Sequence, residues 1–478
     1  MYQIDFQHPV RVWFVGIGGI SMSGLAMILA REGFAVGGSD KVESAISREL
    51  EASGIRVAIG QRRENITDEI DLAVFSAAIH PDNPEYEAVL EKGIPFLTRA
   101  ELLGQLMKNY RLPAAVSGTH GKTTTTSILS EILLAVDADP TLSIGGILPS
   151  IGGNVRIGGG KYFVAEACEY TDSFLQLFPK VGIILNIEED HLDYFKDLHH
   201  IRKSFRRFAE LIPADGVLVI NAEIRDLPEI TGGLACKVVT FSGTDPRKAA
   251  AGSRKPGAEK KAQPADYYPS GITYDEWGHP SFELHGPAEY GAPVRIRLRI
   301  PGTHNVGNAI AAIAAAEWMG ISREDCARGA AGFTGTERRF QYIGEKNGFT
   351  IIDDYAHHPT EIMATLRAAG ACPHRRIVCV FQPHTYTRTK ALLKEFAQAL
   401  TLADVVVLAK IYPARETDTL GVSSETLRQE ILRLGHECLC FPDFSEIEKY
   451  LLANCRKGDL VITMGAGNVD EVGKNILS

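Results

Sequence analysis

With 478 residues, the chain is long enough for about three domains, each with a hydrophobic core of its own. Its formal net charge of −9 argues against nucleic acid as the main partner, and its eight cysteines include no Cys-x-x-Cys pair of a zinc or redox site. No stretch approaches the ~20 uninterrupted apolar residues of a membrane span, and the polar, acidic N-terminus lacks the features of a signal peptide, so we expect a cytoplasmic protein with reduced thiols.

The first predicted domain, residues 1–112, has the pattern of an α/β unit. A glycine-rich turn over residues 16–24 separates the first strand from a helix over residues 25–32. This turn lacks the third glycine of the dinucleotide-binding fingerprint, because Ser21 stands there, and Asp40 ends the second strand. We therefore predict a site for a diphosphate-bearing ligand that is not specifically NAD, although tight packing of a helix on a strand would explain the turn equally well. The strands expected here are residues 10–15, 35–39, 73–76 and 95–97.

A second glycine-rich turn opens the next block. The apolar run 112–116 leads into Gly118-Thr119-His120-Gly121-Lys122-Thr123-Thr124 and then a helix-like segment. In such a turn, backbone N–H groups and the helix N-terminus face phosphates, Lys122 neutralises their charge and Thr123 ligates Mg²⁺. The usual P-loop has a glycine where this chain has Val116. An isolated Gly-Lys-Thr is equally compatible with an ordinary strand-to-helix turn, but the apolar run, Gly118 and the four threonines favour ATP binding.

The rest of the chain continues the alternation of strands and helices. The second predicted domain, residues 113–336, contains a basic segment over residues 245–264 that we interpret as a mobile surface insertion, with a phosphate-binding flap as the alternative. A hairpin region and a helix over residues 305–319 follow this segment. The third domain is predicted over residues 337–478. The strands expected in these two domains are residues 162–166, 181–186, 217–221, 272–284, 294–300, 350–353, 376–381, 405–408 and 459–464.

A metal site is predicted where two neighbouring strands end. Glu166 ends one strand-like run, and the segment 186–191, which contains His191, ends the next. Because the carboxyl ends of parallel strands share one edge, this carboxylate and imidazole should lie near the phosphate loop. Oxygen and imidazole ligands beside a triphosphate suit Mg²⁺ or Mn²⁺, so we predict Thr123, Glu166 and His191 as ligands. The alternative for His191 is a hydrogen-bonded structural residue.

Two arginine-containing segments and one cluster of acids and histidines complete the candidate chemistry. Residues 337–340, Glu-Arg-Arg-Phe, and residues 382–389 offer guanidinium groups that hold carboxylates or phosphates bidentately, although a single arginine is more often a solvated surface charge. Residues 353–359, Asp-Asp-Tyr-Ala-His-His-Pro, follow a strand. Adjacent acids and histidines in such a loop are costly unless they are paired or liganded, and the alternative is a structural turn.

Taken together, these motifs resemble those of the Mur ligase family, in order and over essentially the whole chain. The resemblance implies an N-terminal Rossmann-like nucleotide-sugar domain, a central P-loop-type ATPase domain with a mainly parallel sheet, and a C-terminal Rossmann-like α/β domain. The opening glycine block and residues 353–359 are most similar to the family member that acts on L-alanine. The motifs that carry the resemblance are residues 118–124, 186–191, 302–308, 338–340, 353–359 and 382–389.

The resemblance implies a reaction in cytoplasmic peptidoglycan precursor synthesis. ATP phosphorylates the lactyl carboxylate of UDP-N-acetylmuramic acid, and the amine of L-alanine attacks the acyl phosphate, which gives ADP and phosphate. Lys122 then holds the β- and γ-phosphates, Thr123 and Glu166 bind one Mg²⁺, and His191 binds a second. Arg339 stabilises the transferring phosphoryl group.

The same resemblance implies binding roles for further residues. Asp354 lies near the ribose and phosphates of ATP, and Arg388 grips the carboxylate of the amino acid. Several relatives use a carbamylated lysine at the second metal, but this chain has Lys203 and Arg206 near the expected spacing, and neither is assigned. Glu169 is a further carboxylate beside the site. The other implied residues are His304, Asn305 and Asn308 near adenine; His357 and His384 beside the amino acid; Gly16, Gly18 and Gly19 at the UDP diphosphate; and Asp40 and Ser76 near uridine.

Three alternative functions are compatible with parts of the sequence. A related ligase that acts on a preformed murein tripeptide shares most of the ATP site and differs in the amino-acid pocket. An NAD-dependent oxidoreductase rests only on the N-terminal turn, and Ser21 and the separate ATP loop argue against it. A non-catalytic nucleotide-binding regulator would not need the acids, His191 and the arginines together. We expect a monomer or weak homodimer whose three domains close around the substrates.

Overall fold

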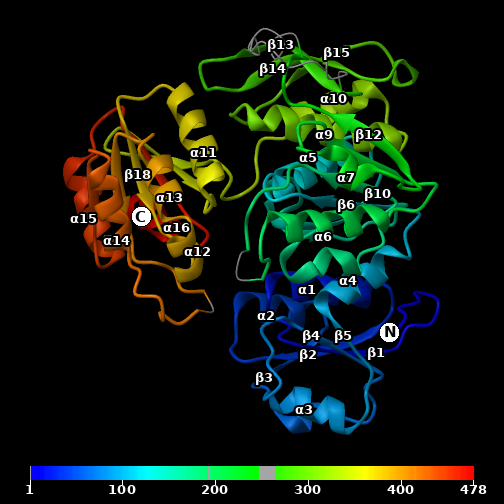
Figure 1. The fold of residues 1–478 in the computed structure, drawn as a ribbon. Helices are drawn as coiled ribbons and strands as arrows, with labels where there is room; N and C mark the ends of the chain where they lie inside the picture. Colours follow the sequence, from blue (N-terminus) through cyan, green and yellow to red (C-terminus); the bar gives the residue numbers. More distant parts are fainter. Residues whose placement is uncertain (1, 192–193, 247–264, 415) are drawn as a thin grey trace.

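The computed structural model describes residues 2–191, 194–246, 265–414 and 416–478. Figure 1 shows three α/β units: the N-terminal unit in blue lies below the central unit in cyan and green, and the C-terminal unit in yellow to red lies beside the central one. Each unit is built on its own mainly parallel sheet, which confirms the predicted fold class. Residues 247–264 of the predicted mobile insertion lie outside the described residues.

The N-terminal unit has a five-stranded, fully parallel sheet in the order β3-β2-β1-β4-β5. Its central strand β1 is buried because apolar clusters cover both faces of the sheet. The strand order reverses at β1, which is where ligands bind in open α/β sheets. Its elements are β1 Arg11–Val15, α1 Ile20–Arg31, β2 Ala35–Asp40, α2 Ala45–Ala52, β3 Arg56–Ile59, η1 Arg63–Asn65, β4 Leu72–Phe75, α3 Pro84–Glu91, β5 Phe96–Thr98 and α4 Arg99–Met107.

The central unit has a seven-stranded sheet in the order β12-β11-β10-β6-β9-β7-β8, in which only β7 and β8 pair antiparallel. The alanine-rich helix α9 packs on α5, and its small side chains allow this close contact. The elements up to β12 are β6 Leu112–Ser117, α5 Lys122–Leu134, β7 Thr141–Leu148, η2 Pro149–Ile151, β8 Gly153–Arg156, β9 Tyr162–Glu166, η3 Tyr170–Gln176, β10 Val181–Ile184, α6 Leu198–Glu210, β11 Val217–Asn221, α7 Leu227–Thr231 and β12 Lys237–Phe241.

A small antiparallel sheet, β13-β14-β15, and two helices complete the central unit. Nε of Arg323 and Oε1 of Glu317 form a fully buried ion pair 2.7 Å long between α10 and α9. Tyr267, directly before β13, also donates to Glu317 at 2.6 Å, and this contact connects the small sheet to the two helices. Arg323 satisfies its remaining donors on the carbonyl groups of Pro287 and Gly291. The elements are β13 Tyr268–Tyr274, β14 Pro280–His285, η4 Ala288–Tyr290, β15 Val294–Arg297, α9 His304–Trp318 and α10 Arg323–Gly332.

The C-terminal unit has a six-stranded sheet in the order β16-β17-β21-β18-β19-β20, with β16 antiparallel to β17 and the other pairs parallel. Helices cover both faces, each over its own apolar cluster. The elements are β16 Gln341–Lys346, β17 Phe349–Asp354, α11 Pro359–Ala371, β18 Ile377–Phe381, α12 Tyr386–Ala391, α13 Leu393–Leu400, β19 Val405–Leu408, α14 Ser424–Arg433, β20 Cys438–Cys440, α15 Phe444–Asn454, β21 Leu460–Met464 and α16 Asp470–Leu477.

The N-terminal and central units share one apolar core. A single cluster contains Leu106 of α4 together with Phe163 of β9 and Phe174 of η3. The backbones also meet closely, because a Cβ atom at Gly104 would lie 1.9 Å from the carbonyl oxygen of Gln176. Only a residue without a side chain allows this approach. These two units therefore pack as one body.

The C-terminal unit attaches to the central unit differently. Its two apolar clusters contain only its own residues. At one end of the contact, the turn between β13 and β14 packs against α11. A Cβ atom at Gly278 would lie 3.3 Å from Cβ of Ala371. Sγ of Cys372 lies 3.4 Å from the carbonyl oxygen of Trp277. The other contacts are the polar ones described below. This unit is thus docked on the central unit rather than fused with it.

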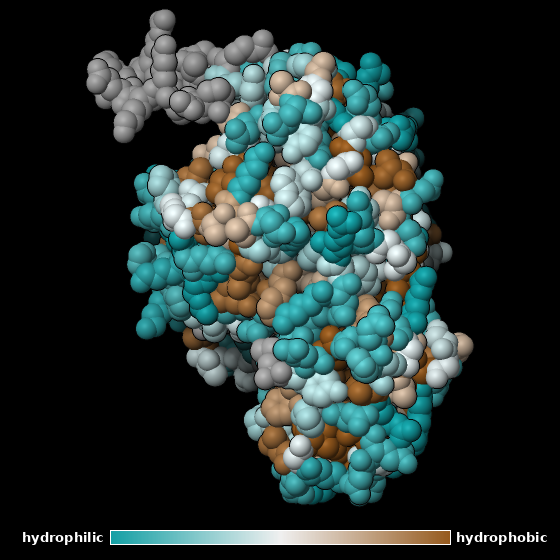
Figure 2. All heavy atoms as spheres, turned by 90° about the vertical axis from the view of Figure 1, so that its right-hand side faces the viewer, coloured by the Kyte–Doolittle hydropathy of each residue, from teal (hydrophilic) through white to brown (hydrophobic). Residues whose placement is uncertain are grey.

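The molecular surface is largely hydrophilic on the face shown in Figure 2, with apolar side chains scattered among polar ones. Within the described ranges, no helix is long and apolar enough to cross a membrane.

The expected strands at residues 162–166, 217–221 and 405–408 coincide with β9, β11 and β19. The expected start of the first helix at residue 25 was wrong, because α1 begins at Ile20, directly after the glycine turn. The strands that we did not predict are β3, β7, β8, β12, β16 and β20. All except β7 lie at a sheet edge, where one side of the strand faces solvent and the apolar pattern is short.

Candidate active site

The phosphate loop lies between β6 and α5, at the carboxyl edge of the central sheet. Gly118 has a φ of +140° and Gly121, the N-cap of α5, a φ of +84°. Neither position has room for a side chain: a Cβ atom at Gly118 would lie 2.9 Å from Cβ of Leu185, and one at Gly121 would lie 2.6 Å from Oδ1 of Asn308. The structure thus gives these two glycines the geometric role that a phosphate-binding turn requires.

Asn186, which follows β10, holds the loop from the neighbouring strand. The backbone N–H of His120 donates to Oδ1 of Asn186 at 2.7 Å, and Nδ2 of Asn186 donates to the carbonyl oxygen of His120 at 3.0 Å. The side chain of Thr119 accepts from the backbone N–H of Glu188 at 2.9 Å. The loop is therefore preorganised by the segment that carries His191.

Lys122 points back into its own loop. Its Nζ donates to the carbonyl oxygens of Gly118 at 2.5 Å and Thr119 at 3.0 Å, and it lies 3.0 Å from Oε2 of Glu169. Burial opposes the charge of Lys122, but the carboxylate of Glu169, with smaller contributions from Cys168 and Glu166, raises its pKa above the ordinary value. Lys122 is accordingly a buried cation whose partner is Glu169, the carboxylate for which the sequence indicated no definite role.

Thr123, Glu166 and Arg339 converge at the start of α5. Oγ1 of Thr123 donates to Oε2 of Glu166 at 2.8 Å, and a guanidinium nitrogen of Arg339 donates to Oγ1 of Thr123 at 3.4 Å. The N–H of Gly145 in β7 also donates to Oε2 of Glu166, at 3.1 Å. A Cβ atom at Gly145 would lie 2.2 Å from this oxygen, so β7 approaches only because the residue is glycine. Sequence reasoning missed Gly145; its one signal was a Gly-Gly pair within an apolar run.

His191 lies beside Glu169 rather than beside Glu166. Its Nε2 is 3.9 Å from Oε1 of Glu169 and 3.8 Å from Oδ2 of Asp190, and its ring lies against Tyr170 at a centroid distance of 4.6 Å. The backbone of His191 has a φ of +53°, in the left-handed region that residues other than glycine rarely adopt. The structure thus separates the predicted metal ligands: Thr123 lies with Glu166, whereas His191 lies beside Glu169, which was not a predicted ligand. The oxygen pair of Thr123 and Glu166 suits Mg²⁺ or Mn²⁺, and His191 adds an imidazole nitrogen to the carboxylate of Glu169.

Another group of metal-type side chains, His120, Glu188 and His358, lies nearby with its ligand atoms within 4.8 Å of one another. Nδ1 of His120 is 3.1 Å from Oε1 of Glu361, and its Nε2 is 3.4 Å from Oε2 of Glu188. Burial lowers the pKa of His120, but these two carboxylates outweigh it and raise the pKa to about 9. Nε2 of His358 lies 3.1 Å from the carbonyl oxygen of Glu189, so it donates there. The group therefore forms a network of ion pairs and hydrogen bonds that connects the two units.

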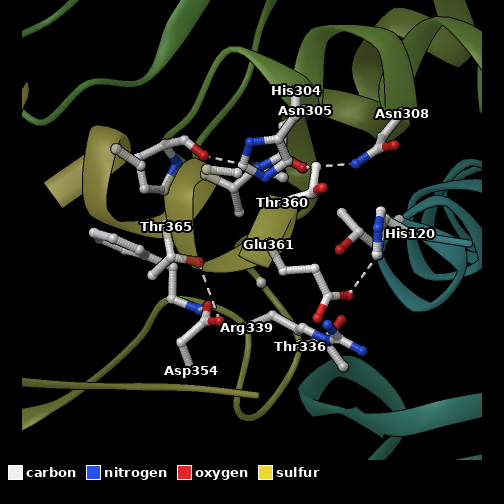
Figure 3. A pocket seen from close by; sticks show the side chains of 18 of the residues that line it. His120, His304, Asn305, Asn308, Thr336, Arg339, Asp354, Thr360, Glu361 and Thr365 are labelled. Carbon is white, nitrogen blue, oxygen red and sulfur yellow. Dashed lines mark hydrogen bonds and ion pairs between the residues drawn. The ribbon is translucent and has the colours of Figure 1, made fainter. Parts of the chain in front are cut away.

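A cavity of about 250 Å³ opens between α9 of the central unit and α11 of the C-terminal unit (Figure 3). The predicted ATP residues His304, Asn305, Asn308, Arg339 and Asp354 all line it, as do His120, Gly121 and Thr124. Nδ2 of Asn308 donates to Oδ1 of Asn305 at 2.9 Å, and Nδ2 of Asn305 donates to the carbonyl oxygen of Pro301 at 2.7 Å. Apolar walls from Ile300, Pro301 and Phe333 beside these amides suit a flat heteroaromatic base.

Asp354 lines this cavity, but its oxygens are largely used within the protein. They accept from the backbone N–H of Phe340 at 2.7 Å and of Ala356 at 2.8 Å and from Thr365 at 3.2 Å. Burial raises the pKa of Asp354 to about 6, against the opposing effect of Arg339. Its clearest structural effect is to anchor the segment that carries Arg339.

The residues predicted to bind the amino acid also lie together. Arg388 donates through Nε and a terminal nitrogen to Oδ1 of Asp190, at 3.3 and 3.1 Å, and its other terminal nitrogen donates to Nδ1 of His384 at 3.2 Å. The rings of His384 and His357 are 5.8 Å apart. Burial opposes the charge of Asp190, but Arg388 holds the pKa of that carboxyl well below its usual range. Sequence reasoning missed Asp190, because its partner is distant in the chain.

The predicted UDP residues meet at the carboxyl ends of β1, β2 and β4. Oδ2 of Asp40 accepts from the N–H of Gly18 at 2.8 Å, and Gly16 packs against Ser76, where a Cβ atom would lie 3.0 Å from Cβ of Ser76. Asp40 thus supports the glycine turn itself, and its role near uridine stays a prediction. Gly19 lies in the same turn as the N-cap of α1. A hollow in the N-terminal unit is lined by residues that we had not predicted: Lys41, Gln61, His80 and Asn83.

Three family models match the chain in succession: "Mur ligase family, catalytic domain" over residues 11–111, "Mur ligase middle domain" over residues 116–316, and "Mur ligase, glutamate ligase domain" over residues 338–467. The chain belongs to the Mur ligase family. The resemblance inferred from its motifs is thereby confirmed.

Similar members of the Mur ligase family match along their full length. The UDP-N-acetylmuramate–L-alanine ligases of Lachnospira eligens and Agathobacter rectalis are 54% and 53% identical to the chain, and each match covers 100% of both sequences. The crystal structure of UDP-N-acetylmuramate-alanine ligase MurC from Thermotoga maritima superposes with a TM-score of 0.78 at 27% identity and 98% coverage of both chains. A murein peptide ligase from Psychrobacter arcticus gives a TM-score of 0.71 at 25% identity, also with 98% coverage of both chains.

Proposed function

We propose that the protein joins L-alanine to UDP-N-acetylmuramate in an ATP-dependent ligation that yields ADP and phosphate, a step of peptidoglycan precursor synthesis in the cytoplasm. The observation that carries this proposal is the full-length match, at up to 54% identity, to relatives that bear the name of this ligase. The geometry supports it, because a phosphate loop, two groups of metal-type ligands and a carboxylate-binding arginine lie around one interface between two units.

In the first half-reaction, the terminal phosphoryl group of ATP passes to the lactyl carboxylate. Lys122, which pairs with Glu169 in the structure, would turn toward the β- and γ-phosphates and neutralise their charge. Arg339, beside Thr123, would balance the charge of the transferring group. Bound at Thr123 with Glu166 and at His191 with Glu169, Mg²⁺ or Mn²⁺ would draw charge from the phosphate oxygens. The resulting acyl phosphate activates the carboxyl carbon for attack.

In the second half-reaction, the amine of L-alanine attacks this carbon, and phosphate leaves. Arg388 would hold the carboxylate of alanine through its planar fork of donors, which matches a carboxylate geometrically. His384 supports this guanidinium by accepting from it at 3.2 Å. Because these residues belong to α12 and its N-terminal loop, the C-terminal unit would deliver the amino acid to an acyl phosphate formed at its interface with the central unit.

The alternative within the family is ligation of a preformed murein peptide, the activity after which the Psychrobacter arcticus ligase is named. Phosphate release from ATP separates the two. With Mg²⁺ present, UDP-N-acetylmuramate plus L-alanine is compared with each substrate omitted and with glycine, serine or a tripeptide in place of alanine. We expect release that requires both the sugar nucleotide and L-alanine. Release only with the tripeptide would assign the chain to peptide ligation, and no release with any set would contradict a ligase.

A further inference from the structure

His357 presents one ring nitrogen that the described protein does not use. Its Nδ1 lies 3.0 Å from the carbonyl oxygen of Tyr355. A carbonyl oxygen only accepts, so Nδ1 carries the proton and Nε2 carries a lone pair. Burial lowers the pKa of His357 to about 4, against the opposing effect of Glu361, so the ring is neutral at neutral pH. Among the described residues, no hydrogen bond engages Nε2.

The position of His357 is held from two sides. Its backbone N–H donates to Oε2 of Glu361 at 3.1 Å, and the same carboxylate oxygen lies 3.4 Å from Nδ1. The ring packs edge-on against Tyr355 at 5.6 Å. His357 therefore has the arrangement of a general base: the imidazole is neutral, one acceptor sets its tautomer, and an anion lies close to the protonated nitrogen.

The unused nitrogen lies in the group that faces the amino acid. The ring of His357 is 5.8 Å from that of His384, which accepts from Arg388, and Arg388 pairs with Asp190. An α-amino acid is a zwitterion, so Arg388 matches its carboxylate and Asp190 matches its ammonium group. Its amine is only two bonds from the carboxylate carbon, which keeps it next to these histidines once Arg388 holds the carboxylate. The other charged group that faces His357 is Glu361.

We propose that Nε2 of His357 accepts the proton that the amine of the incoming amino acid loses during ligation, which makes His357 a catalytic residue of the proposed reaction. The ammonium group of the bound amino acid first releases one proton to solvent, which frees the nitrogen lone pair. This lone pair forms the C–N bond to the acyl carbon, and the C=O π pair moves onto oxygen. The nitrogen, now positively charged, gives one proton to Nε2. The oxygen pair then re-forms C=O, the bond to the phosphate oxygen breaks with its electron pair, and phosphate leaves. The carbonyl of Tyr355 and the carboxylate of Glu361 stabilise the imidazolium that forms, and it returns its proton to solvent.

This inference rests on the proposed function, and the test separates the two. Hydroxylamine is neutral near pH 7, unlike the amine of alanine, and it captures acyl phosphates as hydroxamates without a base. His357→Asn places an amide donor where Nδ1–H donates to Tyr355 and removes the basic nitrogen. His374→Asn is the matched control, because exposed His374 makes the same local contact, with Nδ1 2.7 Å from the carbonyl oxygen of Cys372 two residues earlier.

For each protein, two rates are measured with ATP, Mg²⁺ and UDP-N-acetylmuramate: alanine-dependent ligation and hydroxylamine-dependent hydroxamate formation. We expect His357→Asn to lower kcat for alanine by about 10²-fold or more and to leave hydroxamate formation within about twofold of the wild type. His374→Asn should leave both rates unchanged. Alanine turnover within twofold of the wild type in His357→Asn, or an equal loss of both rates, would overturn the inference. A wild-type protein that forms neither product would instead refute the proposed function, and the inference with it.

Discussion

Arg388 on α12 and Asp190 in the loop after β10 form an ion pair across the two units, with Nε and a terminal nitrogen of the guanidinium 3.3 and 3.1 Å from Oδ1 of the carboxylate. Both side chains are largely buried. A carboxylate of the protein therefore contacts the guanidinium that we expect to bind the carboxylate of the substrate. An amino acid that binds Arg388 has to share or replace this contact, which couples amino-acid binding to the docking of the C-terminal unit.

Arg388→Lys should raise the KM for L-alanine by about 10- to 100-fold, because lysine keeps the charge but loses the planar fork of donors. The KM for ATP should stay within about threefold of the wild-type value, since the residues predicted to bind ATP do not include Arg388. Steady-state kinetics measure both. Arg428→Lys, in an exposed pair with Glu425 on α14, is the matched control and should change neither value. An unchanged KM for alanine would remove Arg388 from the amino-acid site.

Lys122→Ala should abolish ATP turnover and leave the binding of UDP-N-acetylmuramate intact, because the predicted nucleotide-sugar residues lie on the N-terminal sheet. Isothermal titration calorimetry measures binding of the sugar nucleotide, and a phosphate-release assay measures ATP turnover. Lys92→Ala, which removes a surface pair with Asp68, serves as the control. Equal loss of binding and turnover would contradict the assignment of the two ligands to different units.

Gly145→Ala should lower turnover by at least about 10-fold, because the added methyl group would lie 2.2 Å from Oε2 of Glu166 and displace that carboxylate from Thr123. The concentration of Mg²⁺ needed for half-maximal rate should rise with it. Gly332→Ala, at a position where no atom lies within 4 Å of the new Cβ, should behave like the wild type. A normal Mg²⁺ dependence in Gly145→Ala would argue against Glu166 as a metal ligand.

The ion pairs of His120 with Glu188 and Glu361 should weaken as the pH rises. The pKa of His120 is raised from 6.5 to about 9, so the stabilisation is fully present below pH 6.5 and is lost as the pH passes through 9. A shift of this size corresponds to about 3 kcal/mol. The melting temperature of the wild type should therefore exceed that of His120→Gln at pH 7, and the difference should shrink by pH 10. His8→Gln, which removes an exposed pair with Asp5, should show no such trend.

Ligand binding should move the C-terminal unit and leave the other two in place. The N-terminal and central units share one apolar cluster, whereas the C-terminal unit has clusters of its own and meets the central unit through polar contacts and the turn at Gly278. The small-angle scattering curve of the protein with an ATP analogue and UDP-N-acetylmuramate should differ from the curve of the free protein. The radius of gyration should be smaller with the ligands bound, because the C-terminal unit closes on the other two. An identical curve under both conditions would argue against domain closure.

Much of the framework was predictable from the sequence, because it depends on local pattern. Buried parallel strands such as β9 and β11 are continuous apolar runs, and a glycine turn before Lys122 fixes where β6 ends and α5 begins. The carboxyl-edge rule for parallel sheets is then sufficient to place Glu166 near Thr123.

The contacts that we could not predict join residues that are distant in the sequence and meet only in the folded chain. Glu169 faces Lys122 across 47 residues, and Asp190 faces Arg388 across 198. Gly145 matters because of a distance to Glu166, not because of its neighbours in the sequence. The hydrogen bond by which Asp40 supports Gly18 of the turn likewise has no signal in the sequence. Periodicity and spacing carry no information on such contacts.

The continuous core beneath α4 and η3 and the separate interior of the C-terminal unit tolerate different substitutions. Activation of the sugar nucleotide needs the N-terminal and central units in one relative orientation, so substitutions such as a side chain at Gly104 would disturb it wherever the two backbones touch. The residues expected to choose the amino acid sit on a unit with a separate interior. Substitutions confined to α12 and its N-terminal loop can therefore alter which nucleophile is accepted without disturbing the core that the N-terminal and central units share.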